Sequence, residues 1–304
     1  MSPGRARSPL GKSSDHCRDA KTVIDSHLHV WDLDRADYPW LGPHLAPIDI
    51  SLGLDDVRAD LRFTGVDGVV LVQAADNAED TATMFAVADA AAEVVGVVAW
   101  APLDDPEVTA QRIAELRADP RFVGIRVLIH DMADRDWIVR PQQDASLECL
   151  AANHVPFDYV TADPLALRHV PTICERHPDL PVVIDHLGKP PVGGSPEQLR
   201  SWRDLLARAA ESPTVYAKVS GLYPPGDANA WSVEDLRPIV DAALELFGAD
   251  RLMLGSDWPV SILAGGYRRV WSELNRIVGD LPTAQREAIL GGTATAFYGL
   301  GRDE

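Results

Sequence analysis

Two histidines stand two residues apart in the short apolar stretch of residues 23–30. In a β-strand, residues i and i+2 point to the same face, so His27 and His29 would project side by side with Asp25 below them. Burying two imidazoles without partners is unfavourable. The spacing therefore predicts a metal site, or a polar substrate group held by two nitrogens. The alternative is one core histidine and one surface histidine.

Later strand-like stretches also carry or end in polar and aromatic side chains. Any one of them alone would be explained by core packing, but their recurrence at matching strand ends favours an active site. These residues are Gln73, Trp100, Arg126, His130, Asp158, Asp185, His186, Lys218, Ser220, Ser256 and Asp257. We expect the histidines of the tail, loops and helices to be solvated, namely His16, His44, His154, His169 and His177.

The elements that must position these side chains are strands alternating with helices. Buried strands that alternate with helices form parallel βαβ units, and eight such units predict a closed (β/α)8 barrel, a TIM barrel. An open doubly wound sheet is the alternative, but its GxGxxG motif is absent after the first strand. Chemistry in such barrels lies at the carboxyl ends of the strands. The strands are predicted over residues 23–30, 65–74, 94–100, 122–129, 155–160, 180–187, 215–220 and 251–256.

The connection after the first strand, residues 31–60, is long for a compact domain, and long connections are often functional. It contains Trp31, Tyr38 and Trp40, which would either wall a pocket or seal the end of the barrel.

Length and charge exclude several classes of function. The chain has 304 residues, 46% of them hydrophobic, which is enough for one barrel domain over residues 22–304. Its 46 acidic and 28 basic residues give a net charge of -18, so no nucleic acid or membrane partner is expected. No apolar run approaches the length of a membrane span.

Cysteine usage and the start of the chain fit a cytoplasmic protein. Cys17, Cys149 and Cys174 form no close pair, so neither a disulfide framework nor a thiolate zinc site is supported. Residues 1–21 are polar and basic without the apolar core of a signal peptide, and we expect a disordered extension.

Several motifs resemble the amidohydrolase superfamily, whose skeleton is HxH on the first strand, His on the sixth and Asp on the eighth. The resemblance is narrowest to the sugar-lactonase branch of L-fuconolactonases, L-rhamnonolactonases and 2-pyrone-4,6-dicarboxylate lactonases. It covers about residues 23–300. The motifs are IDSHLHVWD (24–32), DYPWL (37–41), DHLGKP (185–190), KVSGL (218–222) and GSDWPV (255–260).

The resemblance implies a hydrolase of sugar-acid lactones in carbohydrate catabolism. Members with two metal ions carry a bridging Lys or Glu on the fourth strand and a His on the fifth, where this chain has Arg126 and Asp158. The resemblance therefore implies at most one divalent ion, Zn or Mn, and members of this branch also act without a metal. The ligands of such an ion would be His27, His29, His186 and Asp257.

The resemblance also implies roles for individual residues. Asp257 would take a proton from water and return it to the leaving ring oxygen, provided that exclusion of water raises its pKa. His27, His29 and His186 would polarise the ester carbonyl. Arg126 would bind the substrate, or alternatively form a buried ion pair with Asp158 or Asp25. The expected sugar contacts are Trp31, Trp40, Gln73, His130, Lys218 and Trp258.

Other functions stay compatible with these residues. Metal-dependent decarboxylases of the same superfamily share the HxH, His and Asp skeleton, and a barrel can also serve as a non-catalytic binding protein. The intact skeleton argues against the second. The expected partner is a small-molecule lactone, neutral rather than dicarboxylate because few arginines can be placed near the site. The sequence is compatible with a homo-oligomer.

Overall fold

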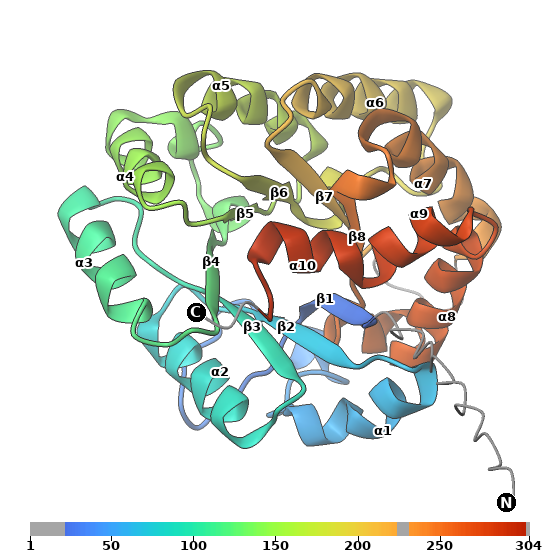
Figure 1. Cartoon of the computed structure of the whole chain (residues 1–304), viewed down its shortest axis with the longest axis horizontal. Coiled ribbons are helices and arrows are strands. Elements are labelled where there is room, and N and C mark those ends of the chain that lie inside the picture. The colour runs from blue at the N-terminus through green and yellow to red at the C-terminus, as the bar shows by residue number, and fades with distance from the viewer. Residues whose placement is uncertain (1–21, 224–230, 302–304) are drawn as a thin grey trace, which may run out of the picture.

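The computed structural model describes residues 22–223 and 231–301. Its centre is one sheet of eight parallel strands, which pair in chain order from β1 to β8 (Figure 1). The predicted (β/α)8 barrel is confirmed, and the predicted disordered extension, residues 1–21, lies outside the described residues. The strands are β1 (Ile24–Leu28), β2 (Gly68–Val72), β3 (Val94–Ala99), β4 (Phe122–Val127), β5 (Phe157–Tyr159), β6 (Val182–Ile184), β7 (Val215–Val219) and β8 (Leu252–Leu254).

The first and last strands meet and close the sheet, which excludes the open doubly wound alternative. Leu28 forms a parallel bridge with Trp258. The amide of His29 donates to the carbonyl of Trp258 at 2.7 Å, and the amide of Asp257 donates to the carbonyl of His27 at 2.9 Å. The backbone segments that carry the HxH pair and the eighth-strand aspartate are therefore hydrogen-bonded to each other directly.

Asp25 reinforces this closure through hydrogen bonds to both backbone segments. Its Oδ1 accepts hydrogen bonds from the amide of His27 at 3.2 Å and from the amide of Ser256 at 2.9 Å. Its side chain is fully buried, and burial raises its pKa to about 6. One carboxyl thus connects the two segments from which His27 and Asp257 emerge.

Helices surround the barrel and form its outer layer (Figure 1). Several begin where the sequence predicts, because polar caps satisfy their free amides: Asn77 accepts from the amide of Asp80, and Ser195 accepts from the amide of Gln198. The helices are α1 (Leu54–Thr64), α2 (Ala78–Ala90), α3 (Pro106–Leu116), α4 (Pro141–Ala152), α5 (His169–Arg176), α6 (Pro196–Ala210), α7 (Val233–Phe247), α8 (Tyr267–Val278), α9 (Thr283–Glu287) and α10 (Thr293–Tyr298).

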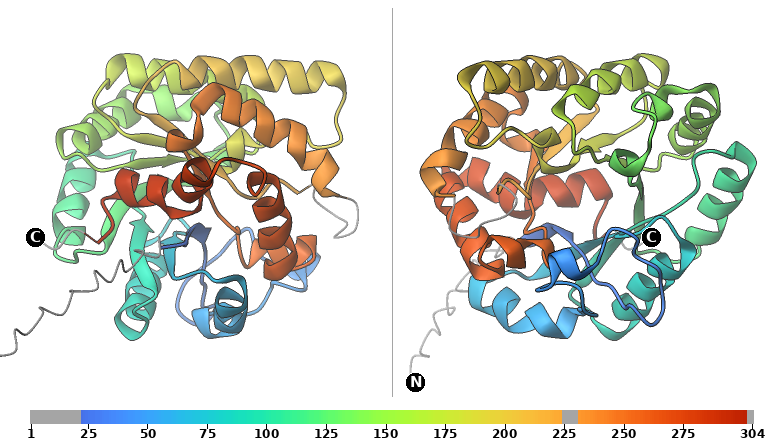
Figure 2. Two further views of the ribbon diagram at one scale, coloured as in Figure 1. Left: turned by 45° about the vertical axis from the view of Figure 1, so that its right-hand side comes forward. Right: turned by 180° about the vertical axis from the view of Figure 1, so that it is seen from behind.

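The two ends of the barrel are covered differently. Helix α10 lies across one end (Figure 1), and the connection between β1 and α1 lies on the opposite side, seen from behind in Figure 2. This connection is shorter than predicted, because α1 already begins at Leu54. Among the described residues, no helix has the length and apolar character needed to cross a membrane.

Candidate active site

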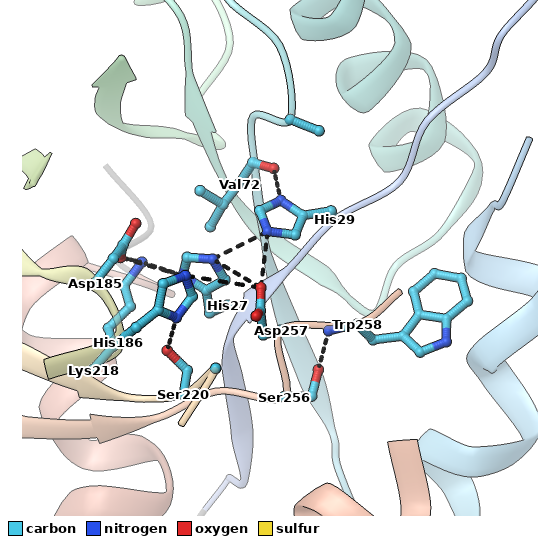
Figure 3. A network of polar contacts seen from close by, with 12 residues as sticks. His27, His29, Val72, Asp185, His186, Lys218, Ser220, Ser256, Asp257 and Trp258 are labelled. Atoms are coloured by element: carbon cyan, nitrogen blue, oxygen red, sulfur yellow. Dashed lines mark hydrogen bonds and ion pairs between the residues drawn. The ribbon is translucent and has the colours of Figure 1, made fainter. Parts of the chain in front are cut away.

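The three predicted histidines converge at the carboxyl ends of β1 and β6 (Figure 3). The Nε2 atoms of His27 and His29 lie 3.1 Å apart, and the ring centroids of His27 and His186 lie 4.6 Å apart. His29 Nδ1 bonds the carbonyl of Val72 at 2.7 Å, and His186 Nδ1 bonds Ser220 Oγ at 2.9 Å. Since a carbonyl can only accept, His29 carries its proton on Nδ1 and leaves Nε2 free to accept or to bind a cation.

Asp257 faces these histidines from the turn after β8. Its Oδ1 lies 3.4 Å from Nε2 of His29, 3.8 Å from Nε2 of His27 and 3.9 Å from Nε2 of His186. Its Oδ2 accepts a hydrogen bond from Tyr223 Oη at 2.7 Å. The hydroxyl therefore holds one carboxylate oxygen and leaves the other facing the imidazoles.

Glycine is required next to this cluster. Gly221 has φ +54°, and a methyl group there would lie 2.5 Å from His186 Nδ1 and 2.7 Å from Asp257 Oδ2. A side chain at this position would displace both catalytic candidates, and the left-handed backbone itself favours glycine.

The charges of the cluster at neutral pH follow from burial and its neighbours. Burial raises the pKa of Asp257, but the neighbouring His186, His29, Lys189 and His27 outweigh it and hold the pKa well below its usual value. This differs from the raised pKa expected from the sequence, because that expectation considered the exclusion of water and not the opposing effect of these neighbours, of which Lys189 was not foreseen. Burial lowers the pKa of His186 to about 3 and that of His27 well below its usual value, so both imidazoles are neutral.

Beneath the histidines lies a buried group of charged side chains, which we call the ionic layer: Arg126, Asp158, Asp185 and Lys218. Lys218 Nζ lies 2.5 Å from Asp158 and 3.0 Å from Asp185, and Arg126 Nη1 lies 3.0 Å from Asp185. Tyr298 of α10 donates to Asp158 at 2.9 Å from the other end of the barrel. The two acids and two bases balance in charge, which makes their common burial tolerable.

The ionic layer fixes His27. Lys218 Nζ lies 3.2 Å and Asp185 Oδ1 3.3 Å from His27 Nδ1, while Arg126 Nη1 lies 3.3 Å from His27 Nε2. A donor and an acceptor thus meet at Nδ1, so either tautomer of His27 finds a partner there. The alternative of a buried ion pair for Arg126 is correct in kind, but its partner is Asp185 rather than Asp158 or Asp25.

A cavity of about 180 Å³ opens above the histidines. Six of the predicted site residues line it: His29, Trp40, Arg126, His130, His186 and Asp257. The indole of Trp40 is held by a hydrogen bond from Nε1 to the carbonyl of Ala74 at 2.7 Å. An aromatic wall, a carboxylate and several nitrogen donors in one small cavity suit a polar ring with an ester group.

Four predicted sugar contacts are placed elsewhere. Trp31 is buried behind Trp40 and donates to the carbonyl of Ile50, and Gln73 donates to the carbonyl of Arg126. Lys218 belongs to the ionic layer, where its charge neutralises two carboxylates. Figure 3 shows the indole of Trp258 pointing away from the histidines. Each of the four thus has a packing or hydrogen-bonding reason for its position.

Outside the site, two histidines expected to be solvated are buried. His177 lies between Asp144 and Glu148, each at 3.0 Å, and His169 bonds the carbonyl of Arg135 at 3.0 Å. These two histidines thus have carboxylates and a backbone carbonyl of other segments as hydrogen-bond partners, in place of the water expected from the sequence.

Two site residues were missed by the sequence analysis. Lys189 lines the cavity from the turn after β6, and Tyr223 holds Asp257. Lys189 falls within the DHLGKP motif, so a signal for it was present in the sequence. Tyr223 follows the KVSGL motif directly, and only the folded chain brings its hydroxyl to Asp257.

The donor set fits one divalent ion. His27, His186 and Asp257 each offer a ligand atom, and these atoms lie within 4.8 Å of one another. Nε2 of His29 lies close to two of them. Neutral imidazole nitrogens with one carboxylate oxygen are ligands typical of Zn and suit Mn as well. Within the described part of the chain, β4 and β5 offer Arg126 and Asp158 in place of ligands for a second ion, and both are engaged in the ionic layer.

Comparison with known proteins gives consistent matches over almost the whole chain. The family model described as Amidohydrolase matches residues 24–300. L-fucono-1,5-lactonase from Burkholderia ambifaria is 35% identical over 289 residues, which cover 92% of this chain and 96% of that protein. The protein of the same name from Burkholderia multivorans is 34% identical over 286 residues, covering 91% and 96%. A crystal structure of an amidohydrolase from Burkholderia multivorans with bound Zn has a TM-score of 0.84 at 34% identity, covering 92% of this chain and 99% of that one.

Proposed function

The chain belongs to the amidohydrolase family, and from this premise we propose that it is a hydrolase that opens the lactone ring of a sugar acid, a carboxylic ester hydrolase. One observation carries the proposal. Asp257 Oδ1 faces the Nε2 atoms of His27, His29 and His186 at 3.4–3.9 Å, next to a cavity of about 180 Å³. A water-activating carboxylate beside several groups that polarise a carbonyl is the arrangement that ester hydrolysis needs.

In the proposed reaction, the ester carbonyl lies against the histidines and Arg126, which stabilise the charge that develops on its oxygen. Asp257 is ionised because its pKa is low, and Oδ1 takes a proton from the attacking water. The carbonyl carbon gains the water oxygen, the bond to the ring oxygen breaks, and Asp257 returns the proton to that ring oxygen. Tyr223 keeps Oδ2 engaged throughout, so that Oδ1 performs both transfers.

A divalent ion on His27, His29, His186 and Asp257 would add Lewis-acid stabilisation of the developing oxyanion when bound. Without the ion, the three histidines act on the substrate directly, as in the reaction above. Arg126 then supplies the positive charge beside them, since its Nη1 lies 3.3 Å from His27 Nε2. The residues thus support both modes that the family resemblance implies.

The competing functions have less support. Relatives that share about a third of their residues with this chain over nine-tenths of its length are named lactonases, whereas decarboxylases among the similar solved structures are 14–15% identical to it. A non-catalytic binding protein would not need an ionised aspartate aimed at three imidazoles. Cys149 and Cys174 are free thiols, which supports our further proposal that the protein works in the reducing cytoplasm.

A pH-indicator screen of aldonolactones tests the function. L-Fucono- and L-rhamnonolactones come first, each with the purified protein, with chelator, and with added Zn²⁺ or Mn²⁺. We expect turnover well above a protein-free blank, which is needed because lactones hydrolyse spontaneously. Resistance to chelator would assign the polarising task to the histidines and Arg126, and restoration by metal would assign it to one ion. Absence of turnover on every lactone under all three conditions would contradict the proposal.

A further inference from the structure

The turn after β6 has an unusual backbone. His186, Leu187, Gly188 and Lys189 all have positive φ, at 54°, 52°, 69° and 55°. Three of these four residues carry side chains, for which this left-handed region is unfavourable. Strain of this kind persists only where the surrounding structure enforces it, and it clusters at functional sites.

The surroundings do enforce this turn. Trp202 Nε1 donates to the carbonyl of Leu187 at 2.8 Å, and the amide of Lys189 donates to the carbonyl of His186 at 2.9 Å. Leu167 packs so closely that a methyl group on Gly188 would lie 2.6 Å from it. Side chains of two helical segments and a hydrogen bond within the turn thus hold its backbone in place.

The consequence of the turn is that it brings Lys189 to the cavity together with His186. Lys189 Nζ makes one long hydrogen bond, 3.3 Å to the carbonyl of Gly221. An ammonium has three donors, and within the described residues no carboxylate lies within ion-pair distance of this one. Burial lowers the pKa of Lys189, while the negative charges of Asp257 and Asp185 oppose this effect. A half-buried ammonium that lines a cavity and has unused donors can bind an oxygen of a ligand.

Lys189 also stands at a junction. A second, larger cavity of about 810 Å³ shares Lys189, Ala162 and Val260 with the first. Its walls beyond Lys189 are mainly apolar, with Pro190, Leu222, Ile262 and Leu263 among them. A substrate ring with its ester at Asp257 would therefore direct its opposite edge, with its hydroxyl groups, past the ammonium.

We propose that Lys189 is a specificity-determining residue that donates a hydrogen bond to a hydroxyl oxygen of the substrate, so that the site favours polyhydroxylated lactones over unsubstituted ones. This inference rests on the proposed lactonase function. It assigns Lys189 to the sugar rather than to the ester group, and it identifies the hydroxyl groups as the feature of the substrate that the enzyme recognises.

The test is a specificity comparison between two δ-lactones of equal ring size. One is the best polyhydroxylated δ-lactone from the screen, and the other is δ-valerolactone, which has no hydroxyl group. Wild type, Lys189→Met and Lys189→Arg are compared, with thermal unfolding as the control for folding. We expect Lys189→Met to lower kcat/KM about ten- to hundredfold for the hydroxylated lactone, mostly through KM, with less than threefold change for δ-valerolactone. Lys189→Arg should keep part of the preference, because it retains charged donors.

Equal losses on both lactones would show that Lys189 acts only through the charge of Asp257, and would overturn the inference while leaving the lactonase function intact. No loss on either would overturn it too. A hydroxylated lactam, which resists opening, provides a readout independent of turnover: calorimetric titration should give an about tenfold weaker Kd for Lys189→Met. An unchanged Kd would contradict the inference even if no lactone were hydrolysed. Lys189→Gln replaces Lys189→Met if the latter does not fold.

Discussion

The lysines of the described residues, Lys218 and Lys189, lie in two adjoining regions with opposite designs. In the ionic layer, Lys218 is fully buried and lies 2.5 and 3.0 Å from two carboxylates. At the cavity, Lys189 has one carbonyl at 3.3 Å. The first charge is satisfied by the protein and positions His27, whereas the second keeps donors for a ligand. The number of hydrogen-bond and ion-pair partners, rather than the residue type, thus distinguishes a structural charge from one available to the substrate.

The same contrast holds for the carboxylates. Lys218, His27 and Arg126 outweigh burial at Asp185 and hold its pKa well below the usual value, whereas burial of Asp25 raises its pKa to about 6. Asp257 belongs with Asp185, because neighbouring imidazoles and Lys189 keep it ionised. A nearby ammonium, Lys218 or Lys189, thus lowers the pKa of Asp185 and Asp257, whereas only hydrogen-bond donors oppose the effect of burial at Asp25.

The largest effect is expected from breaking the ionic layer. Lys218→Met leaves Asp158 and Asp185 buried with one cation fewer, and the free energy of unfolding should fall by about 3–5 kcal/mol. Denaturant titration measures this. In the double variant Lys218→Met/Asp158→Asn, part of the loss should be recovered because one uncompensated charge is removed as well. A loss below about 1 kcal/mol for the single variant would mean that the layer is not a structural unit.

A pH-dependent effect is expected from Asp25→Asn. The folded pKa of Asp25 is raised from 3.8 to about 6, so the folded state holds this proton more tightly than the unfolded chain. Its stabilising contribution is therefore complete below about pH 4 and is lost as the pH rises through 6. The unfolding free energy of the variant relative to wild type should rise between pH 4 and 7, by up to about 3 kcal/mol. Parallel pH profiles of the two proteins would show that the Asp25 pKa is not raised.

The smallest effect distinguishes two neighbouring tryptophans. Trp40→Ala removes a wall of the cavity, and KM for the lactone should rise about fivefold, equivalent to about 1 kcal/mol. Trp31→Phe is the matched control, because Trp31 is buried behind it. It should lower the unfolding free energy by about 2 kcal/mol with KM unchanged. If Trp31→Phe changed KM and Trp40→Ala did not, the assignment of Trp40 to the cavity wall and of Trp31 to the core would be contradicted.

The barrel and the location of its candidate active site could be predicted from the sequence. Apolar runs alternating with helical segments mark parallel strands, and the HxH spacing places His27 and His29 on one face. Since parallel strands end at the same edge of the barrel, His186 and Asp257 could be expected near the HxH pair. Their selection from the other polar residues at strand ends came from the resemblance to the amidohydrolase superfamily.

The division of polar residues between cavity and interior could not be predicted, because it depends on contacts between different strands. Lys218 and Arg126 sit at similar strand positions, yet Lys218 is enclosed by Asp158 and Asp185 while Arg126 still reaches the cavity. The role of Lys189 depends on a left-handed turn that Trp202 and Leu167 hold in place. No spacing rule encodes either arrangement.

The central claim is that Asp257 activates water for lactone hydrolysis, and the rate of acid release by Asp257→Asn tests it most directly. The variant keeps the size of the side chain and an oxygen acceptor but loses the base. With the best lactone of the screen, kcat should fall about a thousandfold while the thermal unfolding midpoint stays close to that of wild type. A folded Asp257→Asn protein with a near-normal kcat would contradict the mechanism.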